Sequence, residues 1–192
     1  MDRAKQLEEE KIPRLLFKFA TPAIVGMLVN ALYNIVDKIF VGQGVEPLAI
    51  AGIAVGLPIH TLMMAFGMLI GTGATSLISI RLGEKKEEEA ELILGNAMIL
   101  GISIYFVISV LGLIFLEPLL GFFGASSTVM PYAKEYMRII LFGAIFQGIS
   151  FTMNNFIRAE GNPKIAMGTM LIGAILNIIL DPIFIFKLDM GI

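Results

Sequence analysis

Residues 92–116 read LILGNAMILGISIYFVISVLGLIFL, which is 25 consecutive positions without an Asp, Glu, Lys, Arg or His. A helix needs about 20 mostly apolar residues to cross the hydrocarbon core of a bilayer. The stretch is apolar on nearly every face of a helix, and it lacks the alternating pattern of an outer-membrane barrel strand. It therefore predicts a transmembrane α-helix.

Four similar stretches lie around this one in the chain. The five predicted spans are Leu15–Val41, Leu48–Ile80, Leu92–Leu116, Tyr132–Ile157 and Ile165–Phe186. Of the 192 residues, 57% are hydrophobic and 16% are charged, whereas a soluble domain has about 45–50% and about 25%. A water-soluble core of this size could not cover so much apolar surface. We expect an all-α, polytopic membrane helix bundle whose immediate partner is the lipid bilayer.

Several functional classes are excluded by composition. The net charge is −2 with no basic cluster in a polar domain, which argues against nucleic-acid binding. The chain has no cysteine, so thiolate chemistry and Cys-based zinc sites are absent. No paired metal-ligand motif and no nucleophile–base constellation stands out. The sequence predicts a protein that is not an enzyme and that needs no organic cofactor.

The distribution of positive charge predicts the orientation. Ten of the 14 Lys and Arg residues lie before or at the start of the first span, between the second and third, or between the fourth and fifth. Lys and Arg concentrate in cytoplasmic segments. We expect a multi-pass protein of the cell membrane with a cytoplasmic N-terminal segment, residues 1–14, and a membrane domain, residues 15–192. The odd number of spans predicts a fragment of a larger bundle.

Two intramembrane carboxylates are harder to explain by the membrane interface than the other charged residues of the spans. Lys134, Glu135 and Arg138 lie in the first two turns of the fourth span, where their side chains can reach the interface. Asp37 and Asp181 lie four and five residues before the ends of their own spans, which run in the same direction. Both carboxylates therefore fall at nearly the same depth. Ionisable groups in hydrocarbon are costly unless they are paired or hydrated, so each is a candidate functional residue.

Amides accompany both carboxylates at helical spacing. Asn34 precedes Asp37 by three residues and Asn177 precedes Asp181 by four, so each pair shares a helix face. Pro182 cannot donate a backbone hydrogen bond, and it frees a carbonyl one turn back. This set predicts a site for a cation or a shared proton. The alternative is structural: Asp37 forms an ion pair with Lys38 or with a bound lipid headgroup, and the amides join helices.

Two weaker polar features occur in the second and fourth spans. His60 is the only histidine, and we expect it to be a hydrogen-bonded packing residue. Gln147 and Asn154 are seven residues apart and share one face of their helix.

Four ordered motifs resemble the multidrug and toxic compound extrusion (MATE) family. They are Pro22-Ala23 through Leu32-Tyr33-Asn34-Ile35-Val36-Asp37 to Phe40-Val41-Gly42; Gly71-Thr72-Gly73-Ala74 to Leu82-Gly83; Asn154-Asn155-Phe156-Ile157-Arg158-Ala159-Glu160-Gly161-Asn162-Pro163; and Asn177-Ile178-Ile179-Leu180-Asp181-Pro182. The resemblance implies five helices of a six-helix N-lobe, which is half of a twelve-helix transporter.

The resemblance also implies an activity and a site. The family's members are secondary antiporters that expel amphipathic organic cations in exchange for Na⁺ or H⁺. Their N-lobe coupling site matches Asp37, Asn177 and Asp181, where Na⁺ is a possible ligand. The tyrosine and asparagine of the fourth helix match Tyr136 and Asn154, and with Asn34 they form the expected supporting polar network.

The activity would then need a partner, either the missing C-terminal lobe or a second chain. Two alternatives stay open at this point. One is a flippase for lipids or lipid-linked precursors from the same superfamily. The other is a non-transporting membrane module that functions only with a partner chain.

Overall fold

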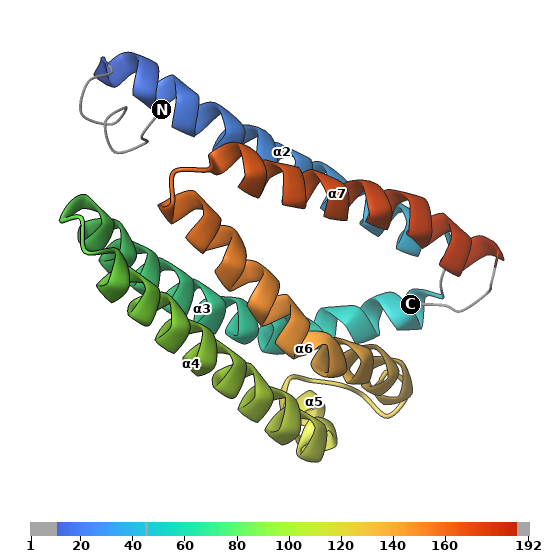
Figure 1. Ribbon diagram of the computed structural model, residues 1–192. Coiled ribbons are helices and arrows are strands. Elements are labelled where there is room, and N and C mark those ends of the chain that lie inside the picture. The colour runs from blue at the N-terminus through green and yellow to red at the C-terminus, as the bar shows by residue number, and fades with distance from the viewer. Residues whose placement is uncertain (1–10, 45, 188–192) are drawn as a thin grey trace.

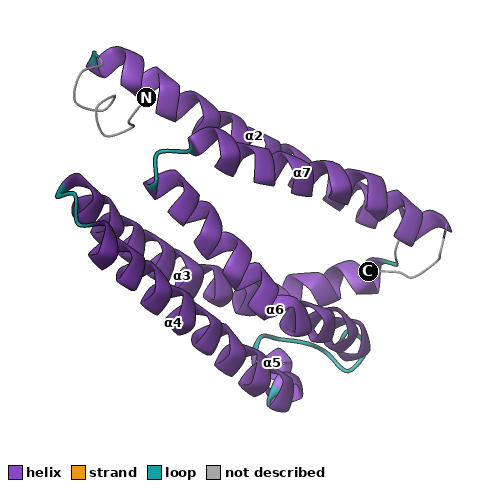
Figure 2. Ribbon diagram, viewed as in Figure 1, coloured by secondary structure: helices purple, strands orange, loops and turns teal. Residues whose placement is uncertain are grey.

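The computed structural model describes residues 11–44 and 46–187, without the side chains of Asn30, Asn34, Asp37 and Lys38. These residues are helical throughout, apart from short turns, and include no strand (Figure 2). The helices are α2 (Ile12–Gly44), α3 (Pro47–Gly83), α4 (Glu87–Ile114), α5 (Leu116–Phe122), α6 (Met130–Ala159), α7 (Pro163–Pro182) and the π-helix η1 (Ile183–Lys187).

Five of the helical segments within the described part of the chain are long and apolar enough to cross a membrane. They correspond to the five predicted spans, so the predicted all-α, polytopic membrane bundle is confirmed. Between 11% and 28% of the most apolar window of each segment is buried within the protein. The remaining apolar surface is therefore available to lipid or to further helices.

The structure corrects the end of the third predicted span. The helix does not continue through Leu116, because Phe115 departs from helical geometry with φ −100° and ψ 20°. The chain then forms the separate seven-residue helix α5, which falls mostly between the third and fourth predicted spans. The side chains of Leu116 and Leu120 are buried on α6 and its neighbours, and this burial stabilises the added turn.

The fifth span also ends differently from the prediction. Pro182 is the last residue of α7, and residues Ile183–Lys187 continue as a π-helix rather than as regular α-helix. Pro182 has no N–H to donate, so the α-helical pattern of hydrogen bonds cannot pass through it. Short π-helical segments occur frequently at functional sites.

The helices form two packed groups (Figure 1). In the first group α3, α4 and α6 pack against one another, with α5 at one end. Tyr105 of α4 lies at the centre of this group with 2% of its surface exposed. Its hydroxyl donates a 2.8 Å hydrogen bond to the backbone carbonyl of Met63 on α3. Its ring lies against Gly148 of α6, so one residue joins all three helices.

In the second group α2 and α7 lie side by side and run in the same direction (Figure 1). A Cβ added to Gly26 on α2 would lie 3.1 Å from the sulfur of Met170 on α7. At the other end, the rings of Phe40 and Phe186 meet edge to face with centroids 6.2 Å apart. The two groups make few contacts with each other, and those contacts are concentrated where α6 leads into α7.

Candidate functional site

Asn177 and Asp181 form a hydrogen-bonded pair near the end of α7. The amide Nδ2 of Asn177 donates to Oδ1 of Asp181 at 2.9 Å. The Oδ1 atom of Asn177 is buried and accepts no hydrogen bond from the described residues. A buried carbonyl oxygen without a donor is costly unless a proton donor or a cation occupies the space beside it. The pair therefore presents a carboxylate and a free amide acceptor at one point in the membrane.

The register of α2 against α7 places the backbone of Asp37 at the level of this pair. Phe40 of α2 contacts Phe186, which follows α7 in η1. Asp37 precedes the first of these residues by three positions, and Asp181 precedes the second by five. At about 1.5 Å per residue, the two backbones differ in depth by about 3 Å.

The side chains of Asp37 and Asn34 lie outside the described residues. Their meeting with Asn177 and Asp181 therefore stays a prediction. Among the described residues, no group of three or more His, Cys, Asp or Glu side chains is arranged to hold a metal ion. A cation at this point would rely on oxygens from α7 together with a carboxylate from α2.

Asn154 lies away from the Asn177–Asp181 pair. Its Nδ2 donates to the carbonyl of Ala166 at 2.9 Å and to the hydroxyl of Thr169 at 2.8 Å. Thr169 precedes Asp181 by 12 residues, which is about 18 Å along α7. Asn154 thus joins α6 to the beginning of α7, and it does not contact the pair.

Tyr136 lies near the opposite end of α6 from Asn154. Its ring is close to Gly56 of α3, where an added Cβ would lie 3.7 Å from Cδ1 of the tyrosine. The ring also packs against the buried core of the first helix group. Eighteen residues of α6 separate Tyr136 from Asn154, so the two side chains do not contact each other, and the expected network with Asn34 stays a prediction.

A polar pair that the sequence analysis did not connect lies between α3 and α6. Nε2 of His60 is 3.1 Å from Nε2 of Gln147, and the glutamine side chain is exposed. An amide nitrogen only donates, so this arrangement has the imidazole nitrogen as the acceptor. His60 is hydrogen-bonded, as expected, but with an exposed partner rather than within a packed interior.

Gln147 shares a face of α6 with Asn154. Asn154, seven residues later on that face, makes the contact with α7 described above. The two helices run in opposite directions from this contact. Gln147 is about 10 Å from Asn154 along α6, and Asn177 is about 12 Å from Thr169 along α7. The His60–Gln147 pair and Asn177 are therefore at nearly the same depth on the two helix groups.

Gly143 of α6 and Gly173 of α7 each have open space beside them. Gly143 lies one turn before Gln147, and Gly173 lies one turn before Asn177. A Cβ added to either glycine would meet no described heavy atom within 4 Å. We call the region between the His60–Gln147 pair on the first helix group and the Asn177–Asp181 pair on the second the α6–α7 opening. One wall carries an imidazole and an amide, and the other carries an amide and a carboxylate.

The fold defines a polytopic membrane protein with five long apolar helices and a hydrogen-bonded amide–carboxylate pair on α7. A model of the MatE family matches residues 22–183. The chain belongs to this family.

Two curated relatives of the chain are named as multidrug export proteins. The chain is 29% identical over 185 residues to the multidrug export protein MepA of Staphylococcus aureus strain MRSA252, a match that covers 96% of this chain and 41% of MepA. The MepA of Staphylococcus haemolyticus is 31% identical over the same length, again with 41% of MepA covered. The chain thus spans about two-fifths of these relatives.

Solved structures agree with the fold. A MATE protein crystallised with MaD3S superimposes with a TM-score of 0.92 at 30% identity, over all of this chain and 43% of that protein. The MATE multidrug transporter DinF-BH superimposes with a TM-score of 0.88 at 44% identity, over 95% of this chain and 41% of that protein. The resemblance stated from the motifs is confirmed.

Proposed function

We propose that this chain is the ion-coupling N-lobe of a secondary antiporter that exports amphipathic organic cations in exchange for Na⁺ or H⁺. The observation that carries the proposal is the Asn177–Asp181 pair, whose amide oxygen is buried without a donor at the depth of Asp37 on the adjacent helix. Two carboxylates and an amide oxygen attract a cation, or they share one proton because two negative charges in a low dielectric repel.

Coupling requires that the bound ion favours one conformation over another. A ligand with equal affinity for two conformations shifts nothing between them. The proposed ion ligands come from α2 and α7, which contact the remaining helices mainly at the α6–α7 junction. Ion binding between α2 and α7 can therefore alter how this pair lies relative to α3, α4 and α6. That change would widen or narrow the α6–α7 opening.

The same opening suits an organic cation as cargo. The groups that define its walls include a carboxylate and neutral amides, and none of them is Lys or Arg. The negative charge of this carboxylate favours a cationic cargo. A flippase for lipid-linked precursors would instead bind anionic headgroups. We further propose that the residue 1–14 segment is cytoplasmic, that the protein lies in the plasma membrane, and that a C-terminal lobe or second chain completes the pathway.

Ethidium efflux from cells tests this function. Cells express the chain alone, or joined to the C-terminal half of a MATE transporter. We expect efflux only from the joined form, and its loss in Asp37→Asn and Asp181→Asn. The exposed Glu88→Gln at the start of α4 is the matched control and should retain efflux. Efflux that persists in both aspartate variants at normal expression would refute the coupling role.

Two further arms examine the ion and the opening. Efflux in sodium-free buffer with an imposed proton gradient separates the two coupling ions, since only a proton-coupled form continues to export. Gly173→Leu places a branched side chain in the open space beside Asn177 and should reduce efflux. Gly168→Leu, which also has open space before it but lies at the beginning of α7, should have a smaller effect.

A further inference from the structure

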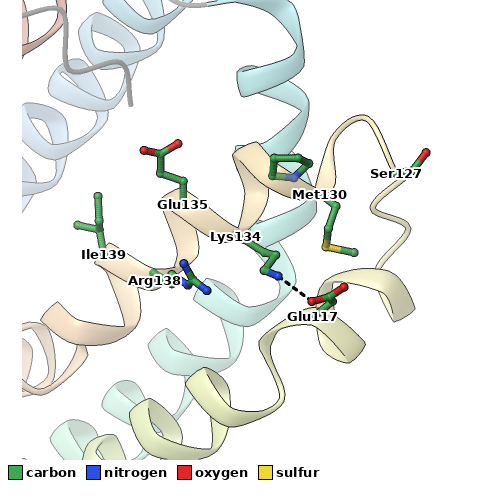
Figure 3. A pocket seen from close by; sticks show the side chains of 8 residues that line it. Glu117, Ser127, Met130, Lys134, Glu135, Arg138 and Ile139 are labelled. Atoms are coloured by element: carbon green, nitrogen blue, oxygen red, sulfur yellow. Dashed lines mark hydrogen bonds and ion pairs between the residues drawn. The ribbon is translucent and has the colours of Figure 1, made fainter.

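A charged groove lies on the outer surface of the bundle, between α5 and the first turns of α6 (Figure 3). Its volume is about 860 Å³, and it is open to the surroundings. Glu117 of α5 and Ser127 of the connecting loop line one side, and Lys134, Glu135 and Arg138 of α6 line the other. None of these residues belongs to the α6–α7 opening, which uses a different face of α6.

The charges in the groove are balanced but not fully paired. Nζ of Lys134 is 2.7 Å from Oε2 of Glu117. Arg138 follows Lys134 by one turn, and the two side chains extend toward the same side of the helix, whereas Glu135 points away (Figure 3). No carboxylate in the described part of the chain forms an ion pair with Arg138. The groove thus presents an unpaired guanidinium beside an ion pair whose carboxylate is mostly exposed.

Arg138 is near enough to the start of α6 for its long side chain to reach the boundary between headgroups and hydrocarbon. It lies eight residues after Met130, the first residue of α6, which is about 12 Å along the helix. From this level an apolar strip continues along α6, in which Ile139, Phe142 and Phe146 expose 62%, 69% and 77% of their surface. A molecule in the groove therefore contacts charged groups at one end and an exposed apolar helix face at the other.

We propose that this groove binds an ethanolamine phospholipid from the leaflet at the N-terminal end of α6. A guanidinium holds a phosphate through two parallel hydrogen bonds, and Lys134 adds a second cation one turn away. The lipid's ammonium group donates to the exposed oxygen of Glu117. One acyl chain covers Ile139, Phe142 and Phe146. The exposed carboxylate of Glu117 favours a lipid whose headgroup carries an ammonium group over a lipid with net negative charge.

Each other ligand would leave some part of the groove without a matching group. Free phosphate, or the soluble headgroup glycerophosphoethanolamine, would leave the apolar strip uncovered. Phosphatidylglycerol lacks the ammonium group and adds a net negative charge next to Glu117. Phosphatidylcholine has a quaternary ammonium, which has no N–H to donate to a carboxylate.

Native mass spectrometry of the 192-residue chain in detergent micelles measures this binding. Phosphatidylethanolamine, phosphatidylglycerol, phosphatidylcholine and glycerophosphoethanolamine are added separately at equal concentrations. We expect the ethanolamine lipid to give the largest bound fraction and the soluble headgroup to give none. Arg138→Gln should weaken its apparent affinity about tenfold, in line with the loss of a charge-assisted hydrogen bond.

Two further variants keep the test decisive. Arg138→Lys preserves the charge and should weaken binding less than Arg138→Gln, because an ammonium lacks the planar fork. It also covers the case in which the glutamine variant aggregates. Lys164→Gln removes an exposed cation at the start of α7 and should leave lipid binding unchanged. Equal binding of the three phospholipids, or binding that is insensitive to both Arg138 variants, would overturn the proposal.

Discussion

Replacing Gly148 by alanine should destabilise the first helix group, because the ring of Tyr105 occupies the position of the added Cβ. The ideal Cβ would lie 2.6 Å from both Cε2 and Cγ of the tyrosine. The ring cannot retreat easily, since only 2% of its surface is exposed. Its hydroxyl is also fixed by the 2.8 Å hydrogen bond to Met63. Either α6 moves away from α4, or the tyrosine leaves its position.

The magnitude follows from two terms of opposite sign. Overpacking a well-filled core costs about 1–3 kcal/mol, and displacement of the ring adds about 1 kcal/mol for the lost hydrogen bond. Alanine in place of glycine favours a helix by up to about 1 kcal/mol in water. That gain is smaller in a membrane, where unpacked segments stay helical. The net expectation is a loss of about 1–4 kcal/mol.

Gly143→Ala is the matched control on the same helix. A Cβ at this position meets no described atom within 4 Å. Thermal unfolding in detergent, followed by size-exclusion chromatography of a fluorescent fusion, compares the two variants. With about 2–4 °C per kcal/mol for a chain of this size, Gly148→Ala should lower Tm by about 2–16 °C and Gly143→Ala should leave it unchanged. Similar shifts for both variants would refute the steric reasoning.

Three other outcomes follow from contacts outside this core. Asn154→Ala removes two hydrogen bonds at the α6–α7 junction. In the same thermal assay it should lower the free energy of unfolding by about 1 kcal/mol. An unchanged Tm would show that other contacts hold the junction. The side-chain hydrogen bonds from Arg81 and Lys86 hold the pKa of Glu84 below its ordinary value, so its ion pairs persist at neutral pH and are lost as the pH falls through that lowered pKa. Arg81→Gln should raise this pKa toward the ordinary value in a carboxyl NMR titration, and no movement would contradict the pairing. The hydrogen bond from Lys134 likewise lowers the pKa of Glu117, and Lys134→Gln should raise it in the same experiment, whereas Lys164→Gln should not.

Hydropathy was sufficient to predict the five spans, but not the break at Phe115. The chain from residue 111 to 120 is almost uniformly apolar, and neither Gly112 nor Pro118 falls at the break itself. Local sequence therefore favours a continued helix up to Leu116. The separate helix α5 forms because burial of Leu116 and Leu120 compensates for the interrupted hydrogen bonds, and that burial depends on α6, which is distant in sequence.

In the candidate site, too, contacts within one helix could be predicted from the sequence, but contacts between helices could not. Spacing alone predicted the Asn177–Asp181 pair, because residues four apart on a helix are neighbours. Spacing also assigned Gln147 and Asn154 to one face of α6, but it could not show that Asn154 bonds to Ala166 and Thr169. The His60–Gln147 pair joins residues 87 positions apart. It depends on the packing of α3 against α6, for which a single sequence has no local signal.

The division into two helix groups gives the proposed coupling a physical basis. The predicted ion ligands belong to α2 and α7, whereas the wall that faces them across the α6–α7 opening belongs to α3 and α6. Because the two groups contact each other mainly at the junction made by Asn154, a change in the α2–α7 pair need not disturb the core around Tyr105. A bound cation would stabilise one arrangement of α2 and α7 by its differential affinity alone. The Gly148→Ala and Asp181→Asn variants therefore act on separate properties, the first on stability and the second on coupling, and a double variant should show additive effects.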